Sequence, residues 1–88
     1  MTTMHLADPV AVWLENGLPV RLVWRGKRYT VSDTPTPIRE TTGFTGITHP
    51  TERLVGWRVQ GTESGGDAYV FDVERIGPDS WQLTAYYD

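Results

Sequence analysis

Apolar and polar residues alternate in short runs along much of this chain, and no segment has the spacing of an amphipathic helix. The runs are separated by Gly, Pro, Asn and Asp, which favour turns. Such a pattern is typical of antiparallel β-structure. It predicts strands at about 10–14, 18–25, 28–33, 54–60, 68–75 and 81–87. We therefore expect a single small all-β antiparallel domain, with about six strands in a meander that forms a curved sheet or a partly open barrel.

Two segments fall outside this pattern. Residues 1–9 are expected to form an N-terminal tail, which leaves 10–88 as the β domain. Residues 34–52 contain seven Thr, three Pro and two Gly, and we expect one long loop there. Phe44 and Ile47 are the apolar side chains best placed to anchor it to the core. A loop of this length is usually either functional or mobile.

The register of the first hairpin depends on the length of its turn. A two-residue turn at Asn16-Gly17 pairs Glu15 with Leu18 and mixes the two faces. A three-residue loop over 15–17 instead gives three aliphatic pairs on one face: Leu14 with Leu18, Val12 with Val20, and Val10 with Leu22. Because the buried face sets the register of a strand pair, the sequence favours the three-residue loop with a bulge at Gly17.

The second hairpin contains a cluster of cations and aromatic residues. A two-residue turn at Gly26-Lys27 suits a type II′ geometry, which prefers Gly first. It pairs Trp24 with Tyr29, and both continue the inward face. It also places Arg25 directly opposite Arg28 on the outward face. Facing like charges destabilise a sheet unless an anion lies nearby, so this position is the main candidate for binding.

The candidate binding residues are Trp13, Arg21, Arg25, Lys27 and Arg28. Four of the eight cations lie within 21–28 with no acid among them, although the net charge is −3. Arg21 is expected close enough to Trp13 for a cation–π contact. Such a face could bind an acidic protein surface, or single-stranded nucleic acid through phosphate contacts and base stacking. Alternatively, the outward carboxylates Asp72 and Glu74 neutralise the arginines within the domain.

The residues for catalysis or metal binding do not form a recognisable pattern. The chain has no Cys, and no Ser lies in a G-x-S-x-G turn. His5 and His49 have no partner at a metal-ligand spacing. We therefore expect no enzyme activity, metal or cofactor; a hydrolase would need a site built from His49, Asp72 or Glu74.

Location can be predicted from the same composition. The lack of Cys fits a reducing cytoplasm, and the first residues do not have the basic and apolar segments of a signal peptide. No run approaches the roughly 20 apolar residues of a membrane span. A cytoplasmic protein with no membrane partner is expected.

Three segments carry a resemblance to known proteins: PVRLVWRGKRYTV (19–31), GWRV (56–59) and WQLTAYYD (81–88). The chain resembles a family of small, uncharacterised actinobacterial proteins and domains with the pattern P-V-x-F-x-W-R-G-R-x-Y-x-V, then W-R-V, a Y-D-L-like strand and W-x-L-x-x-x-x-D. The matching positions are Pro19, Val20, Trp24, Arg25, Gly26, Tyr29, Val31, Trp57, Arg58, Val59, Trp81, Leu83 and Asp88. The segment 34–52 departs from the family, whose members tend to have Trp there.

The resemblance implies no catalytic residues, because the family has no established activity. Some relatives are encoded beside error-prone DNA polymerase components, which implies an accessory role in DNA-damage tolerance. The resemblance and the basic hairpin face together predict a non-catalytic module that binds a protein with an acidic surface. Weak binding of single-stranded nucleic acid by the same face is the alternative, and a small hydrolase is the third. The protein is expected to be a monomer or a dimer paired through an edge strand.

Overall fold

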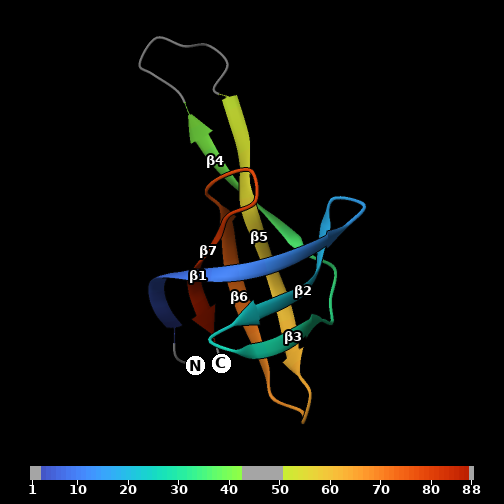
Figure 1. Cartoon of the computed structure of the whole chain (residues 1–88). Coiled ribbons are helices and arrows are strands. Elements are labelled where there is room, and N and C mark those ends of the chain that lie inside the picture. Colours follow the sequence, from blue (N-terminus) through green and yellow to red (C-terminus); the bar gives the residue numbers. More distant parts are fainter. Residues whose placement is uncertain (1–2, 43–50, 88) are drawn as a thin grey trace.

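The computed structural model describes residues 3–42 and 51–87, and these form antiparallel strands with no helix (Figure 1). The strands are β1 (Thr3–Glu15), β2 (Leu18–Trp24), β3 (Lys27–Val31), β4 (Thr36–Thr42), β5 (Thr51–Glu63), β6 (Ala68–Arg75) and β7 (Trp81–Tyr87). The prediction of a small antiparallel all-β domain is confirmed.

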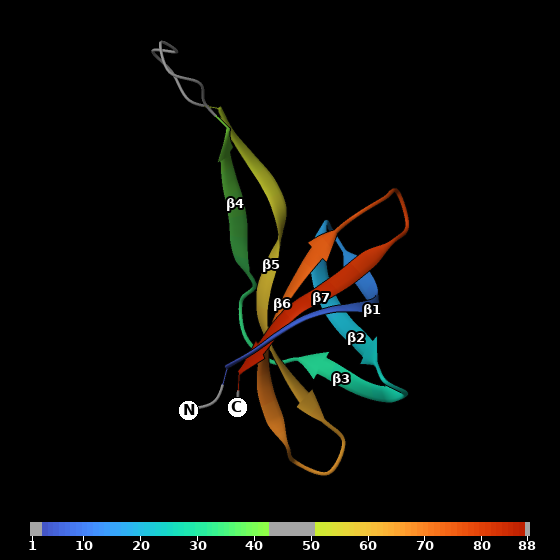
Figure 2. The same ribbon diagram turned by 90° about the vertical axis from the view of Figure 1, so that its left-hand side faces the viewer.

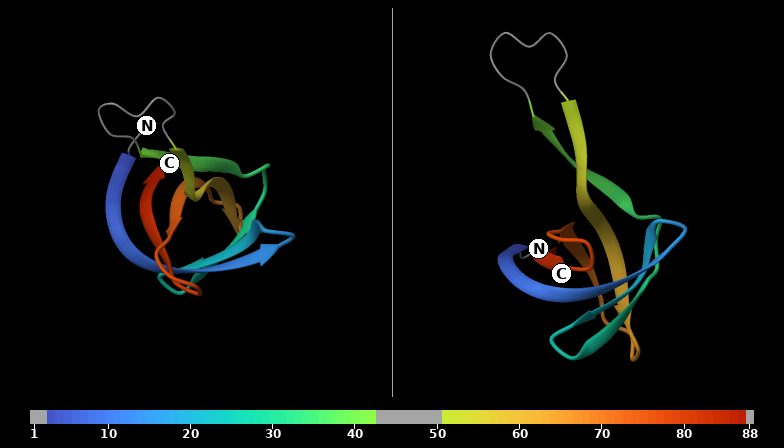
Figure 3. Two further views of the ribbon diagram at one scale, coloured as in Figure 1. Left: turned by 90° about the horizontal axis from the view of Figure 1, so that it is seen from above. Right: turned by 45° about the horizontal axis from the view of Figure 1, so that its top comes forward.

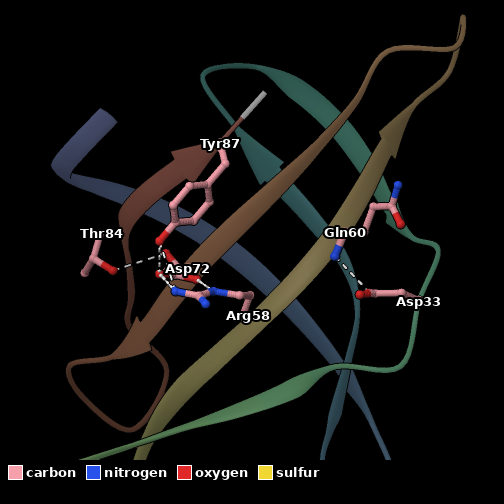
Figure 4. Close-up of polar contacts among 6 residues, drawn as sticks. All are labelled: Asp33, Arg58, Gln60, Asp72, Thr84 and Tyr87. Atoms are coloured by element: carbon pink, nitrogen blue, oxygen red, sulfur yellow. Dashed lines mark hydrogen bonds and ion pairs between the residues drawn. The ribbon is translucent and has the colours of Figure 1, made fainter. Parts of the chain in front are cut away.

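Six of these strands close into a barrel, and β4 lies outside it. The strand order is β3-β2-β1-β7-β6-β5-β4, and a further pairing between β3 and β5 closes the ring, which is seen from above in Figure 3. Val31 pairs with Gly61 at this seam. Beyond it, the Asp33 carboxylate accepts a hydrogen bond from the backbone N–H of Gln60 at 2.8 Å (Figure 4). The side chain of Asp33 thus extends the ladder after β3 has ended.

The long strand β5 belongs both to the barrel and to an arm. Its residues 51–58 pair with β4, and its residues 61–63 pair with β3. β4 and the first part of β5 therefore project from the barrel as a two-stranded arm (Figures 1 and 2). The expected loop over 34–52 is wrong for residues 36–42 and 51–52, which belong to the paired strands β4 and β5. The sequence did not reveal β4 because this polar strand has no alternating apolar residues. Phe44 and Ile47 lie outside the described residues.

The strand β1 begins earlier than the sequence indicated. It starts at Thr3, so the expected tail over residues 1–9 is wrong from that residue onward. β1 pairs with β7 through its first part and with β2 through its last part. A register shift between His5 and Asp8 interrupts the alternation, which removes the signal on which a strand prediction depends.

The barrel interior is filled by aliphatic and aromatic side chains. The buried core residues are Val10, Leu22, Trp24, Tyr29, Val59, Phe71, Val73, Trp81 and Leu83. On the last three strands, the alternation predicts as inward residues Val55, Trp57, Val59, Tyr69, Phe71, Val73, Trp81, Leu83, Ala85 and Tyr87. Most of these are in the core or, like Trp57 and Tyr69, pack against it. Ala85 and Tyr87 are exceptions, because a register shift at Thr84 reverses the faces of the residues that follow. Tyr86 packs against Trp24 instead, with ring centroids 5.1 Å apart, and Tyr87 lies on the outer face.

The first hairpin has the two-residue turn, so the three-residue loop is wrong. Asn16 and Gly17 both have positive φ angles, 53° and 80°, and Glu15 pairs with Leu18. These angles fit a type I′ turn, for which Asn-Gly is the preferred pair. A register shift after the first two pairs then moves Pro19 to the buried face and leaves Leu18 exposed. A two-residue turn mixes the two faces only if the register is regular. The register shift restores Leu22 and Trp24 to the buried face, so the objection to this turn does not apply.

The second hairpin turns one residue earlier than predicted. Arg25 and Gly26 are its central residues, with φ angles of 51° and 78°, which again fit a type I′ turn. Trp24 pairs with Lys27, so neither the Trp24–Tyr29 pair nor the Arg25–Arg28 pair exists. Trp24 and Tyr29 are nevertheless both buried, as expected.

Candidate functional site

The structure divides the five predicted binding residues among three places. Trp13 lies opposite Arg21, and Arg21 lies opposite Thr30, so these residues form one row across β1, β2 and β3. Arg28 lies on the same outer face, opposite Val23. We call Trp13, Arg21 and Arg28 the outer basic face. Its placement agrees with the sequence prediction, although the register that led to the prediction was wrong.

A polar hollow of about 530 Å³ opens on this face. Its lining residues are Arg21, Arg28, Thr30, Thr62, Glu63 and Ser64. The ion pairs found among the described residues use Arg25, Arg53 and Arg58. No carboxylate in the described part of the chain lies within 4.0 Å of the Arg21 or Arg28 guanidinium. Two cations therefore share one hollow without an ion-pair partner from the described residues.

The side chain of Trp13 is 47% exposed beside this hollow. The expected cation–π contact between Arg21 and Trp13 is wrong. Within residues 3–42 and 51–87, the cation–π contacts instead join Arg25 to Trp24, Arg58 to Tyr87 and Arg75 to Trp81. Trp13 is thus available to solvent together with the two arginines.

Arg25 is neutralised within the domain. Its Nη2 atom lies 2.8 Å from Oδ2 of Asp8, and its Nε donates to the same oxygen at 2.9 Å. The Trp24 indole also donates to Oδ2 of Asp8, at 3.2 Å, and the Arg25 guanidinium lies 4.6 Å from the centre of the Trp24 ring. Sequence reasoning missed Asp8 because it lies in the segment interpreted as a tail.

Lys27 faces a second hollow, at the end of the barrel that carries the β2–β3 turn. Because Lys27 pairs with Trp24, it belongs to the opposite side of the hairpin from Arg28. The second hollow is lined by Lys27 and Arg25 and by the aromatic residues Trp24, Tyr29, Tyr69 and Tyr86. Lys27 is therefore not part of the outer basic face.

Asp72 does not neutralise the outer arginines, because Arg58 and Tyr87 bind it on another part of the barrel (Figure 4). Arg58 donates to its two carboxylate oxygens at 2.8 and 3.0 Å, and the Tyr87 hydroxyl donates at 3.0 Å. The hydrogen bond to Asp72 raises the pKa of Arg58 above its ordinary value. Burial, followed by the hydrogen bond to Asp72, raises the pKa of Tyr87. Glu74 forms no ion pair in the described part of the chain and lies opposite Gly56.

Within the described residues, the remaining candidates for catalysis do not form a common site. His49 lies outside them, and His5 is exposed on β1. No group of three or more His, Cys, Asp or Glu side chains in residues 3–42 and 51–87 could hold a metal ion. Among the same residues, no helix has the length and apolar character needed to cross a membrane.

No family model matches the chain, and comparisons with curated proteins and with solved structures find no match either. The candidate function is therefore argued from the geometry of the outer basic face.

Proposed function

We propose that this domain is a non-catalytic interaction module that binds an acidic segment of a partner protein through the outer basic face. The observation that carries the proposal is that Arg21 and Arg28 line one open hollow without a carboxylate partner among the described residues. The free energy of two neighbouring unpaired cations falls when an anion binds between them. A carboxylate can accept two hydrogen bonds from an arginine, which adds direction to the charge attraction.

The composition of the hollow favours a peptide over a polyanion. Glu63 is part of the lining and repels a ligand that carries a charge at every unit. Thr30 and Ser64 offer hydroxyls that can bind the backbone of a peptide, whereas the Thr62 hydroxyl already donates to Ser32. Trp13 adds an exposed aromatic surface, a residue type enriched at protein interfaces. An acidic segment with one apolar side chain for Trp13 would complement all three features.

Weak binding of single-stranded nucleic acid is the second candidate. It is favoured by the exposed Trp13 ring in register with Arg21, since a base can stack on such a ring while a phosphate contacts the cation. With two arginines lining the hollow, the logarithm of the binding constant would fall with the logarithm of salt concentration with a slope of about −1.4. This is a shallow dependence for a nucleic-acid-binding protein.

The resemblance to the actinobacterial family supports one biological setting for this proposal. Its signal is the WRG segment of the second hairpin, Trp24-Arg25-Gly26, together with Trp57-Arg58-Val59. In that setting the acidic partner would belong to the machinery of error-prone DNA synthesis, and the protein would act as an accessory to DNA-damage tolerance in the cytoplasm.

The test is a titration of the isotopically labelled protein with a peptide that has separated Glu residues and one Phe, followed by NMR. We expect saturable shifts at Trp13, Arg21 and Arg28, and their loss in an Arg21→Glu/Arg28→Glu variant. Arg39→Glu/Arg53→Glu is the matched control, because it makes the same change of charge on the exposed arm. The proposal is wrong if the two variants bind the peptide equally. A thymidine oligonucleotide that binds more tightly than the peptide, through the same residues, would select the second candidate.

A further inference from the structure

The second hollow, which we call the mouth, is a separate site from the outer basic face. It has a volume of about 260 Å³ and is lined by Trp24, Tyr29, Tyr69, Tyr86, Arg25 and Lys27. These residues come from strands β2, β3, β6 and β7 and from the β2–β3 turn. Ligand pockets for drug-sized molecules usually have about 300–1,000 Å³, so the mouth suits a smaller molecule.

The aromatic wall of the mouth is held in place by contacts between its rings. Tyr69 meets Tyr29 and Tyr86 at centroid distances of 6.2 Å each, with interplanar angles of 82° and 85°. Phe71, which is fully buried, packs against two rings of this wall. Its ring centroid lies 5.8 Å from that of Trp24 and 4.9 Å from that of Tyr29. Edge-to-face packing of this kind fixes the rings, so a flat ligand would meet a preformed surface.

Three tyrosines line the mouth. The hydroxyls of Tyr29, Tyr69 and Tyr86 form no hydrogen bond with any described residue, whereas the hydroxyl of Tyr87 on the outer face is bonded to Asp72. No buried side-chain nitrogen or oxygen atom in the described part of the chain lacks a partner. The three hydroxyls must therefore be open to solvent, where they can donate to a ligand.

The charges of the mouth favour an anion. Lys27 forms no ion pair within residues 3–42 and 51–87, and no carboxylate is part of the lining. Arg25 is held by Asp8 and is therefore fixed rather than free. Burial is the main cause that raises the pKa of Tyr29, and Glu63, Tyr69 and Asp67 raise it further. Glu63 and Asp67 lie outside the lining, so Lys27 and Arg25 are the charged side chains that a ligand meets in the mouth. The Tyr29 hydroxyl is protonated at neutral pH, as tyrosines ordinarily are, and can donate a hydrogen bond to an anion.

We propose that the mouth binds a small planar aromatic anion, such as an aromatic carboxylate. Its ring would contact the half-buried rings of Tyr69 and Tyr86, next to Trp24, and its anionic group would bind the Lys27 ammonium and a tyrosine hydroxyl. This inference does not rest on the proposed function, because the outer basic face uses neither Lys27 nor the aromatic wall.

The first test is a titration of the whole chain with benzoate, benzyl alcohol and acetate, followed by tryptophan fluorescence and by NMR. Benzoate should bind with a dissociation constant of about 1 mM, which is typical for a ligand of this size. Benzyl alcohol should bind about tenfold more weakly, since it has the ring but not the charge. Acetate should cause no saturable change at Trp24. Equal shifts with all three probes, or none with benzoate at the mouth, would overturn the inference.

The second test separates the two sites by single substitutions in adjacent residues. Lys27→Met should reduce benzoate affinity about tenfold and remove the preference over benzyl alcohol. Arg28→Met, which changes the outer face, should leave benzoate binding unchanged. Tyr86→Phe should weaken binding less than Lys27→Met because it keeps the ring. If Lys27→Met and Arg28→Met weaken benzoate equally, the ligand binds on the outer face and the assignment to the mouth is wrong.

Discussion

The Arg58 guanidinium and the Asp72 carboxylate form a two-point ion pair across β5 and β6, with N···O distances of 2.8 and 3.0 Å. The pair is asymmetric, because the Arg58 side chain is 52% exposed and that of Asp72 only 11%. If Asp72 is removed, water can therefore solvate the Arg58 guanidinium. If Arg58 is removed, water reaches the Asp72 carboxylate much less. The two residues should contribute unequally to stability.

Replacing Arg58 should cost more stability than replacing Asp72. Arg58→Met leaves a buried carboxylate with the Tyr87 hydroxyl as its remaining side-chain donor, and we expect the free energy of unfolding to fall by about 3 kcal/mol. Asp72→Asn leaves a half-exposed cation, with an expected loss of about 1–2 kcal/mol. Urea denaturation followed by tryptophan fluorescence measures both values. The reverse order would show that the burial of Asp72 does not determine the energetics of the pair.

Stability should decrease at alkaline pH. The pKa values of Tyr29 and Tyr87 are raised above the ordinary value of 10.0 in the folded protein, so the unfolded chain loses these protons first as pH rises. The tyrosine contribution is complete below pH 10 and is lost as pH rises through the folded-state pKa values. Urea denaturation at a series of pH values above and below 10 measures this loss of unfolding free energy.

The source of this alkaline loss can be assigned with two variants. Tyr29→Phe and Tyr87→Phe should each make the unfolding free energy less dependent on pH in this range, because each removes one of the titrating hydroxyls. Tyr86→Phe is the control on the same strand as Tyr87. An alkaline loss that is unchanged in both test variants would contradict the assignment.

Gly56 should not tolerate a side chain. A Cβ atom built there overlaps the Val73 carbonyl oxygen and lies 2.9 Å from the Cα of Glu74, and both are backbone atoms that cannot rotate away. Gly56→Ala should lower the free energy of unfolding by about 3 kcal/mol. Gly77→Ala is the matched control, since its Cβ would make only ordinary contacts with Ser80. Equal effects of the two substitutions on the urea midpoint would exclude the steric explanation.

The ion pair of Arg25 with Asp8 should contribute little to stability. The side chains are 59% and 30% exposed, and pairs with this exposure typically contribute less than about 1 kcal/mol. Asp8→Asn keeps an oxygen acceptor for the Trp24 indole and removes only the charge. Its destabilisation should therefore be small at low salt and disappear at high salt, as measured by thermal unfolding. A large loss that persists in high salt would indicate a packing role for Asp8.

The alternation of apolar residues was sufficient to predict the fold class and most of the core. It failed where the backbone departs from regular pairing. The register shifts beside Leu14 and at Thr84 exchange the inward and outward faces, so Leu18 and Tyr87 were both assigned to the wrong side. Sequence alone does not reveal these shifts, because their position depends on how neighbouring strands meet in the closed barrel.

The alternation along each strand also predicted part of the candidate site. Arg21 and Arg28 share an outer face, as the period of two along each strand requires. Arg25 was misplaced because Gly26 fits either position of a two-residue turn, and the structure uses the turn in which Arg25 adopts a positive φ. Its partner Asp8 is 17 residues away in sequence, and no local pattern connects the two.

The two pairings that close the barrel determine how the chain must fold. Thr3 pairs with Tyr87, and Tyr29 pairs with Glu63, so both closing ladders join residues that are remote in sequence. Local hairpins can form first, but neither ladder stabilises the chain until a long loop has been closed at a cost in entropy. The domain therefore has the high contact order of β-barrels, for which folding in milliseconds to seconds is usual.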